Sequence, residues 1–150
     1  MTVARTIVLG FDDSAGSRRA LEVALELAAG LGDTLVIAFG AQPPGRGVGE
    51  EWRAHAAVIE RSGRELTEQA LARAAEAGVP AETEVAPERA VDLLLRLSEE
   101  RDARLIVVGS YGESPLRGAV LGSVPHKLLH LSQVPVLAVP AVPAGAAPAR

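Results

Sequence analysis

Short runs of branched apolar residues alternate with longer segments of helical period, and this alternation restricts the possible folds more than any other feature of the chain. It is typical of successive β-α-β units that build a parallel sheet. The run at 35–39 has no polar alternation, as expected for a central strand covered on both faces. The five expected strands are residues 6–9, 35–39, 81–85, 105–108 and 134–139.

Four segments of helical period separate or follow these runs. Ser14 is expected to cap the first helix, which Gly30 and Gly32 end, and the second spans 50–77. Pro87 is expected to open the third helix within its first turn, and the fourth covers about 124–131. These elements predict an α/β fold of the Rossmann-like class: an open, doubly wound, five-stranded parallel sheet in the order 3-2-1-4-5, with helices on both faces. In such a sheet a crevice opens at the carboxyl ends of strands 1 and 4.

Composition narrows the class of protein. With 150 residues, 48% of them hydrophobic, the chain fits one compact domain over 1–140, and the Ala/Pro-rich tail over 141–150 is expected to be disordered. A net charge of −4 disfavours nucleic acid as a partner, and no apolar stretch reaches membrane-spanning length. The absence of cysteine fits a reducing compartment. We therefore expect a cytoplasmic protein that binds neither nucleic acid nor membrane.

A glycine-rich segment follows the fourth strand. Four glycines lie within residues 107–124, and the last, Gly122, is followed by Ser123 at the start of the final helix. Neither a Walker A sequence nor G-x-G-x-x-G is present. Glycine allows close approach of the main chain to a ligand, and the first turn of a helix offers unpaired N–H groups. The segment therefore predicts an anion site for phosphate, although a connector with glycines for flexibility remains an alternative.

The spacing "GSYG", nine residues, then "GS" resembles the universal stress protein family of the ATP-binding type, G-2x-G-9x-G-(S/T). The opening "VLGFDDSAGSRRAL" and the closing "VPVLAVP" also resemble that family, whose fold is of the adenine nucleotide alpha hydrolase type. The resemblance implies that the chain binds ATP, or ADP or AMP, with Mg²⁺ or Mn²⁺. It also implies a regulatory role in a stress response, with protein partners unknown. The last strand, "VPVLAVP", is apolar and at the sheet edge, so we expect a homodimer in which pairing with a second copy hides its open hydrogen bonds.

The resemblance assigns roles to seven residues. Asp12 would meet the ribose hydroxyls or the water shell of a metal, Phe39 would lend main-chain groups to adenine, and Gly109 would lie against the ribose. The phosphates would be held by Gly112, Gly122, Ser123 and Val124. From the residues alone, Asp12 has a second interpretation as a turn carboxylate that accepts a hydrogen bond from its own main chain.

Two residues depart from the family pattern. Pro125 stands where many relatives carry Ser or Thr, so one N–H and one hydroxyl are missing, and terminal phosphates should bind more weakly or elsewhere. Asp13 stands where glycine is commoner and would repel an anion unless a cation intervenes, an effect that Arg117 would offset.

Catalysis is not the expected role. Beyond Asp12, Asp13 and Arg117 we find no dedicated base, so no catalytic residue is assigned, and slow nucleotide hydrolysis is the alternative. His126 and His130 lie four residues apart, but no third zinc ligand is evident, and no metal-binding residues are assigned. A dimeric scaffold without nucleotide is a further alternative, which Pro125 and Asp13 favour.

Overall fold

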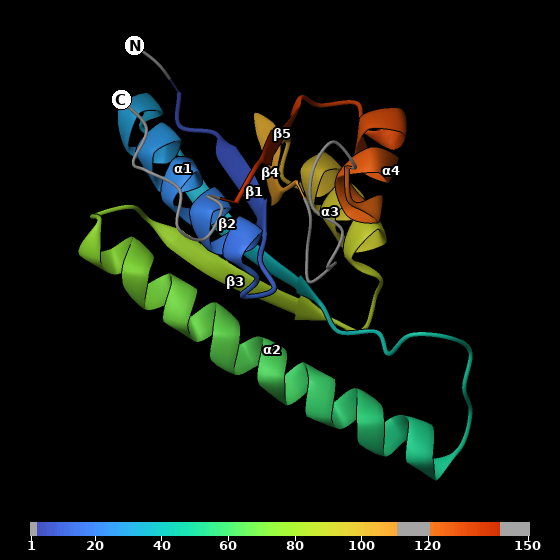
Figure 1. The fold of residues 1–150 in the computed structure, drawn as a ribbon. Coiled ribbons are helices and arrows are strands. Elements are labelled where there is room, and N and C mark those ends of the chain that lie inside the picture. The colour runs from blue at the N-terminus through green and yellow to red at the C-terminus, as the bar shows by residue number, and fades with distance from the viewer. Residues whose placement is uncertain (1–2, 111–120, 142–150) are drawn as a thin grey trace.

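A computed structural model describes residues 3–110 and 121–141, and it contains one parallel sheet between two layers of helices (Figure 1). The sheet runs in the order β3-β2-β1-β4-β5, which confirms the predicted topology. Its strands are β1 Thr6–Gly10, β2 Thr34–Gly40, β3 Ala81–Ala86, β4 Leu105–Gly109 and β5 Val136–Val139. The helices are α1 Ala15–Leu31, α2 Glu50–Glu76, α3 Ala90–Glu100 and α4 Ser123–Leu131. Within the described ranges, no helix is long and apolar enough to cross a bilayer.

Alternate side chains of the central strands fill two separate cores. Ile7, Leu9 and Ile37 are buried against α1 and α2 on one face of the sheet. Val8, Val36 and Ile106 are buried against α3 and α4 on the other face. Because both faces are covered, the buried positions of all three central strands are apolar, as the sequence indicated for residues 35–39.

The first helix begins as predicted and ends at the second of the two predicted glycines. Ser14 is its N-cap, and the Ser14 hydroxyl accepts a hydrogen bond from the Ser17 N–H at 3.2 Å. The helix continues through Gly30 and ends at Leu31, where Gly32 takes the left-handed conformation at φ 71°. Only Gly32 therefore acts as the stop, because a single left-handed residue is enough to end a helix.

The prediction that Pro87 opens the third helix is wrong by about one turn. The helix α3 begins at Ala90, with Arg89 as its N-cap. Residues 86–88 instead bond to the segment after β2: Ala41 N–H donates to the Ala86 carbonyl, and Gln42 N–H donates to the Glu88 carbonyl. These long-range hydrogen bonds hold residues 86–88 in a tight turn, in which the Glu88 N–H also donates to the Ala86 carbonyl at 2.8 Å, and they override the local preference of proline for a first helical turn.

The last strand also starts later than predicted, at Val136 instead of Val134. The Ser132 hydroxyl accepts from the Val134 N–H and donates to the Val134 carbonyl, which closes a local turn. A side-chain turn of this kind competes with strand pairing for the same main-chain groups. Of the predicted tail over 141–150, residues 142–150 lie outside the described residues.

A buried ion pair joins three strands at the end of the sheet opposite the crevice. Asp33, whose side chain is fully buried, accepts hydrogen bonds from the Arg104 guanidinium and from the Arg5 main-chain N–H. Arg104 immediately precedes β4, Arg5 precedes β1 and Asp33 precedes β2. The pair therefore fixes the amino ends of these strands relative to one another.

Candidate functional site

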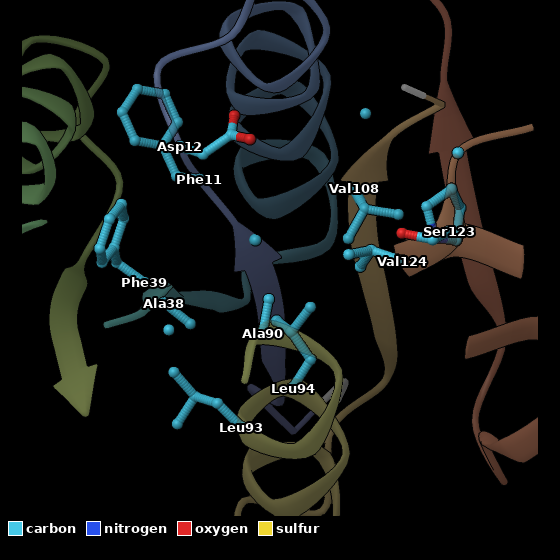
Figure 2. Close-up of a pocket in the computed structure, with 15 residues that line it drawn as sticks. Phe11, Asp12, Ala38, Phe39, Ala90, Leu93, Leu94, Val108, Ser123 and Val124 are labelled. Atoms are coloured by element: carbon cyan, nitrogen blue, oxygen red, sulfur yellow. The ribbon is translucent and has the colours of Figure 1, made fainter. Parts of the chain in front are cut away.

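A pocket of about 390 Å³ opens at the carboxyl ends of β1, β2 and β4, where the sequence predicted a crevice. The beginnings of α3 and α4 complete its wall. Figure 2 shows the rings of Phe11 and Phe39 on one side of the pocket, and Val108, Ser123 and Val124 on the other. Its volume is within the range of about 300–1,000 Å³ that small-molecule sites occupy.

The turn after β1 positions Asp12 at the pocket. The Asp12 carboxylate accepts a hydrogen bond from the Ser14 N–H at 3.0 Å, and the Asp12 N–H donates to the Ser17 hydroxyl at 3.3 Å. Asp12 therefore makes the turn contact that the sequence left open, while its side chain stays exposed and lines the pocket. Such a contact holds a carboxylate in one orientation, so the two interpretations of Asp12 do not exclude each other.

Asp13 lies beside the pocket in an unusual main-chain conformation, with φ at 64°. Its carboxylate forms an ion pair with Arg18 at 3.3 Å, and Arg18 also donates to the Asp13 carbonyl at 2.7 Å. The lining of the pocket includes Asp12 and not Asp13. The sequence predicted that the Asp13 carboxylate would repel a bound anion. Arg18 reduces this repulsion, because its guanidinium pairs with the Asp13 carboxylate outside the pocket.

Phe39 contributes to the pocket at the end of β2, and α2 holds its ring. A Cβ atom at Gly63 of α2 would lie 2.3 Å from the Phe39 ring, so the helix packs directly against the ring. Next to it, a Cβ atom at Gly40 would lie 2.7 Å from the Ala90 nitrogen and the Glu88 carbonyl oxygen. The end of β2 therefore passes close to the start of α3, and only glycine fits at position 40.

The first turn of α4 presents main-chain donors that have no acceptor among the described residues. Gly122 is the N-cap and has no side chain to cap the helix, in contrast to Ser14 on α1. The Gly122 N–H donates to the Ser110 carbonyl at 2.7 Å, and the first helical bond runs from the His126 N–H to the Gly122 carbonyl. The N–H groups of Ser123 and Val124 at the first two helical positions have no intrahelical acceptor. Pro125, at the third position, has no N–H to offer.

Gly109 lines the pocket, but its lack of a side chain also serves the packing of α1. A Cβ atom at Gly109 would lie 2.8 Å from the Gly16 carbonyl carbon and 2.9 Å from the Ser17 nitrogen. The end of β4 therefore approaches the main chain of α1 more closely than any other residue type permits. Gly112 and Arg117, to which the sequence assigned roles near the phosphates, lie outside the described residues.

Six of the seven assigned residues are thus described, and all six line one pocket: Asp12, Phe39, Gly109, Gly122, Ser123 and Val124. Sequence reasoning missed Phe11, Gly40, Ala90 and Leu94, which belong to the same wall. A glycine directly after a buried strand was the available signal for Gly40. Among the described lining residues, Asp12 is the one with a charged side chain.

The histidines lie apart from this pocket. The rings of His126 and His130 meet edge to face, with centroids 4.8 Å apart, on the exposed side of α4. Throughout residues 3–110 and 121–141, no group of three or more His, Cys, Asp or Glu residues is placed to hold a metal ion.

The chain is similar in sequence and in fold to known proteins. The family model described as "Universal stress protein family" matches residues 4–140. The universal stress protein Rv1636 of Mycobacterium tuberculosis is 33% identical over 148 residues, which cover 93% of this chain and 98% of that protein. A crystal structure of a universal stress protein in complex with cAMP is 33% identical, with a TM-score of 0.66, over 93% of this chain and 98% of the other. An Arabidopsis thaliana family protein with AMP bound shares the fold, with a TM-score of 0.69 at 16% identity, over 92% of each chain.

Proposed function

The chain belongs to the universal stress protein family, and we propose that its crevice binds ATP or another adenine nucleotide as the signal of a regulatory stress-response module. The observation that carries the proposal is the first turn of α4, which has no side-chain cap and borders a pocket whose described wall has one charged side chain, that of Asp12. Relatives of this chain bind adenine nucleotides, cAMP in one and AMP in another. A cytoplasmic location is part of the proposal.

The proposed arrangement follows the polarity of the lining. The base would lie on the side of Phe11 and Phe39, where aromatic rings and the end of β2 form the wall. The phosphate would lie at Ser123 and Val124, whose main-chain N–H groups and the Ser123 hydroxyl are donors. Asp12, held by the Ser14 N–H, would face the ribose hydroxyls between them.

A divalent cation fits this site only together with the nucleotide. Asp12 supplies one carboxylate, and the Ser14 N–H occupies one of its oxygens. Magnesium in nucleotide sites is commonly held by one or two carboxylates plus the phosphates of the substrate. Bound Mg²⁺ or Mn²⁺ would neutralise phosphate charge, with Asp12 as the protein ligand, directly or through water.

Binding is tested by equilibrium dialysis of the purified protein against ATP, AMP and cAMP, each with and without Mg²⁺. We expect saturable binding of at least one nucleotide, and mass spectrometry of the native protein should detect co-purified adenine nucleotide. Because the donors are main-chain groups of a folded helix, heat-denatured protein is the control and should bind none. Failure of every nucleotide to saturate the protein at millimolar concentration would overturn the proposal.

We further propose that the protein is a homodimer paired through β5. In the described part of the chain β5 pairs with β4 alone, and its free edge is at the end of the sheet. Leu137 on β5 is 37% exposed, and Leu129 and Leu131 on α4 are 56% and 60% exposed. Pairing with a second copy would bury this apolar surface and satisfy the open edge.

Light scattering is expected to give twice the chain mass of 15.5 kDa. Leu137→Lys should shift the protein to a monomer, because a charge on an edge strand opposes strand pairing. Val3→Lys, which changes another exposed apolar residue away from β5, is the control and should remain dimeric. A monomeric wild-type protein would remove the dimer from the proposal and leave nucleotide binding intact.

A further inference from the structure

We infer that Pro125 makes the crevice selective for adenine nucleotides that carry a single phosphate group over nucleoside triphosphates. This inference rests on the proposed function, since it concerns the same pocket. Pro125 is buried at the third position of α4 and belongs to the wall of the pocket. It is therefore in the first turn of the helix, where a phosphate would meet the protein.

The inference begins with a count of donors at the start of α4. The Gly122 N–H is used by the Ser110 carbonyl, and the His126 N–H is used by the Gly122 carbonyl. Pro125 has no N–H, so the main-chain donors left in this turn are those of Ser123 and Val124. Together with the hydroxyl of Ser123, which lines the pocket, the described residues of this turn offer three donors to an anion. They match the oxygens of one phosphate group, whether it is a monoester or a cyclic diester.

The surface beside these donors does not suit further phosphates. The pyrrolidine ring of Pro125, together with Val108, Val124 and Leu94, gives this part of the wall an apolar character. A phosphate beyond the first would exchange its hydration for contact with carbon atoms. Desolvation of a charged group without a replacement partner is unfavourable, so this part of the pocket disfavours a longer phosphate chain.

The charges of the described pocket wall also disfavour a triphosphate. The charged side chain among the described lining residues is Asp12, which is negative. Two basic side chains, Arg89 and Lys127, line a neighbouring cleft that shares Ser123 and Val124 with the pocket. Arg89 is engaged there by Asp92 at 2.9 Å. Neither of these basic residues lines the main pocket, so its described wall offers no fixed cation for the added charge of a triphosphate.

The test compares affinities for ATP, AMP and cAMP by isothermal titration calorimetry with Mg²⁺ present. We expect the wild-type protein to bind AMP or cAMP at least as tightly as ATP. Pro125→Ala restores the N–H alone, and Pro125→Ser restores the N–H and adds a hydroxyl. Each should raise the affinity for ATP relative to AMP, by about tenfold for Pro125→Ala, because one donor to a charged acceptor has about that effect, and by more for Pro125→Ser, which adds two donors.

Two controls protect the comparison. Pro80→Ala replaces an exposed proline directly before β3, at the end of the sheet opposite the pocket, and should leave the ratio of ATP to AMP affinity unchanged. Thermal melts of both Pro125 variants identify any loss of folding, and the ratio of two affinities measured on the same sample is insensitive to an inactive fraction.

The outcomes separate the two proposals. If ATP binds the wild-type protein more tightly than AMP and cAMP do, or if both Pro125 variants keep the wild-type ratio, the inference is wrong and nucleotide binding stands. If no nucleotide binds the wild-type protein or either variant, the proposed function itself fails, and the inference fails with it.

Discussion

Replacing Ser123 with proline is expected to lower the affinity of the crevice for AMP by about 10- to 100-fold while leaving the fold intact, because two donors to a charged phosphate are lost. The substitution removes the Ser123 N–H and its hydroxyl together. Proline is well tolerated at the first position of a helix, where its missing N–H has no intrahelical acceptor. The preceding residue, Gly122, already has φ −62° and ψ 163°, which is the conformation favoured before proline.

The matched variant Ser123→Ala removes the hydroxyl and keeps the N–H, so its affinity should fall between those of the wild-type protein and Ser123→Pro. Calorimetric titration with AMP measures all three proteins, and circular dichroism confirms that the helix remains. If Ser123→Pro binds AMP as tightly as the wild-type protein does, the phosphate does not lie at the start of α4.

Removal of the buried carboxylate in Asp33→Ala is expected to lower the free energy of unfolding by about 3 kcal/mol, the lower end for loss of one partner of a buried ion pair. The lower end applies because the Arg104 side chain is 25% exposed and can recover some hydration, whereas Asp33 is fully buried. For a chain of this size, the corresponding fall in melting temperature is roughly 6–12 °C. Differential scanning calorimetry and urea titration at pH 7 measure both quantities.

Glu22→Ala is the control for this variant. Glu22 and Arg73 form a well-aligned ion pair at 2.7 Å, but both side chains are exposed, by 48% and 40%. Exposed pairs stabilise proteins little, so Glu22→Ala should melt close to the wild-type temperature. A similar loss of stability in both variants would show that burial is not what makes the Asp33 pair important.

The pH dependence of the same pair has a defined sign. Hydrogen bonding to the Arg104 guanidinium lowers the pKa of Asp33 below its usual value of 3.8, against the opposing effect of burial, and the Arg5 N–H lowers it further. A carboxyl whose pKa is lower in the folded state stabilises the fold above its unfolded value and loses that contribution as pH falls through the folded value. The difference in stability between the wild-type protein and Asp33→Ala should therefore be full above about pH 5 and shrink below 3.8.

Sequence patterns were sufficient for the topology because they report local periodicity and burial. An apolar run such as residues 35–39 indicates a central strand, and right-handed crossovers then leave few possible strand orders. The start of α3 could not be predicted in the same way. Its position depends on hydrogen bonds from Ala41 and Gln42 to residues more than forty positions away in the chain, which no local preference encodes.

The residues that line the pocket could be predicted where a residue type marks a local structure, such as a helix start, and not where it makes a contact between distant segments. Gly122 and Ser123 stand at a helix start, which a sequence can indicate. The contact between Phe39 and Gly63 beside the pocket joins segments that meet only in the folded chain, and so does the salt bridge between Asp33 and Arg104 at the opposite end of the sheet. The sequence contains these residues, but nothing in their neighbourhood indicates the partner.

The tight contact between Gly109 and the first turn of α1 affects how the spacing G-2x-G-9x-G-(S/T) should be interpreted when it is found in a sequence. A side chain at this position would force strand and helix apart whether or not any nucleotide is present. Natural selection for folding alone would then preserve the first glycine, even in descendants that have lost the ligand. Gly122 and Ser123, which follow the loop, are therefore the more informative positions of this spacing. A sequence search for members that bind nucleotide should give these two positions the greater weight.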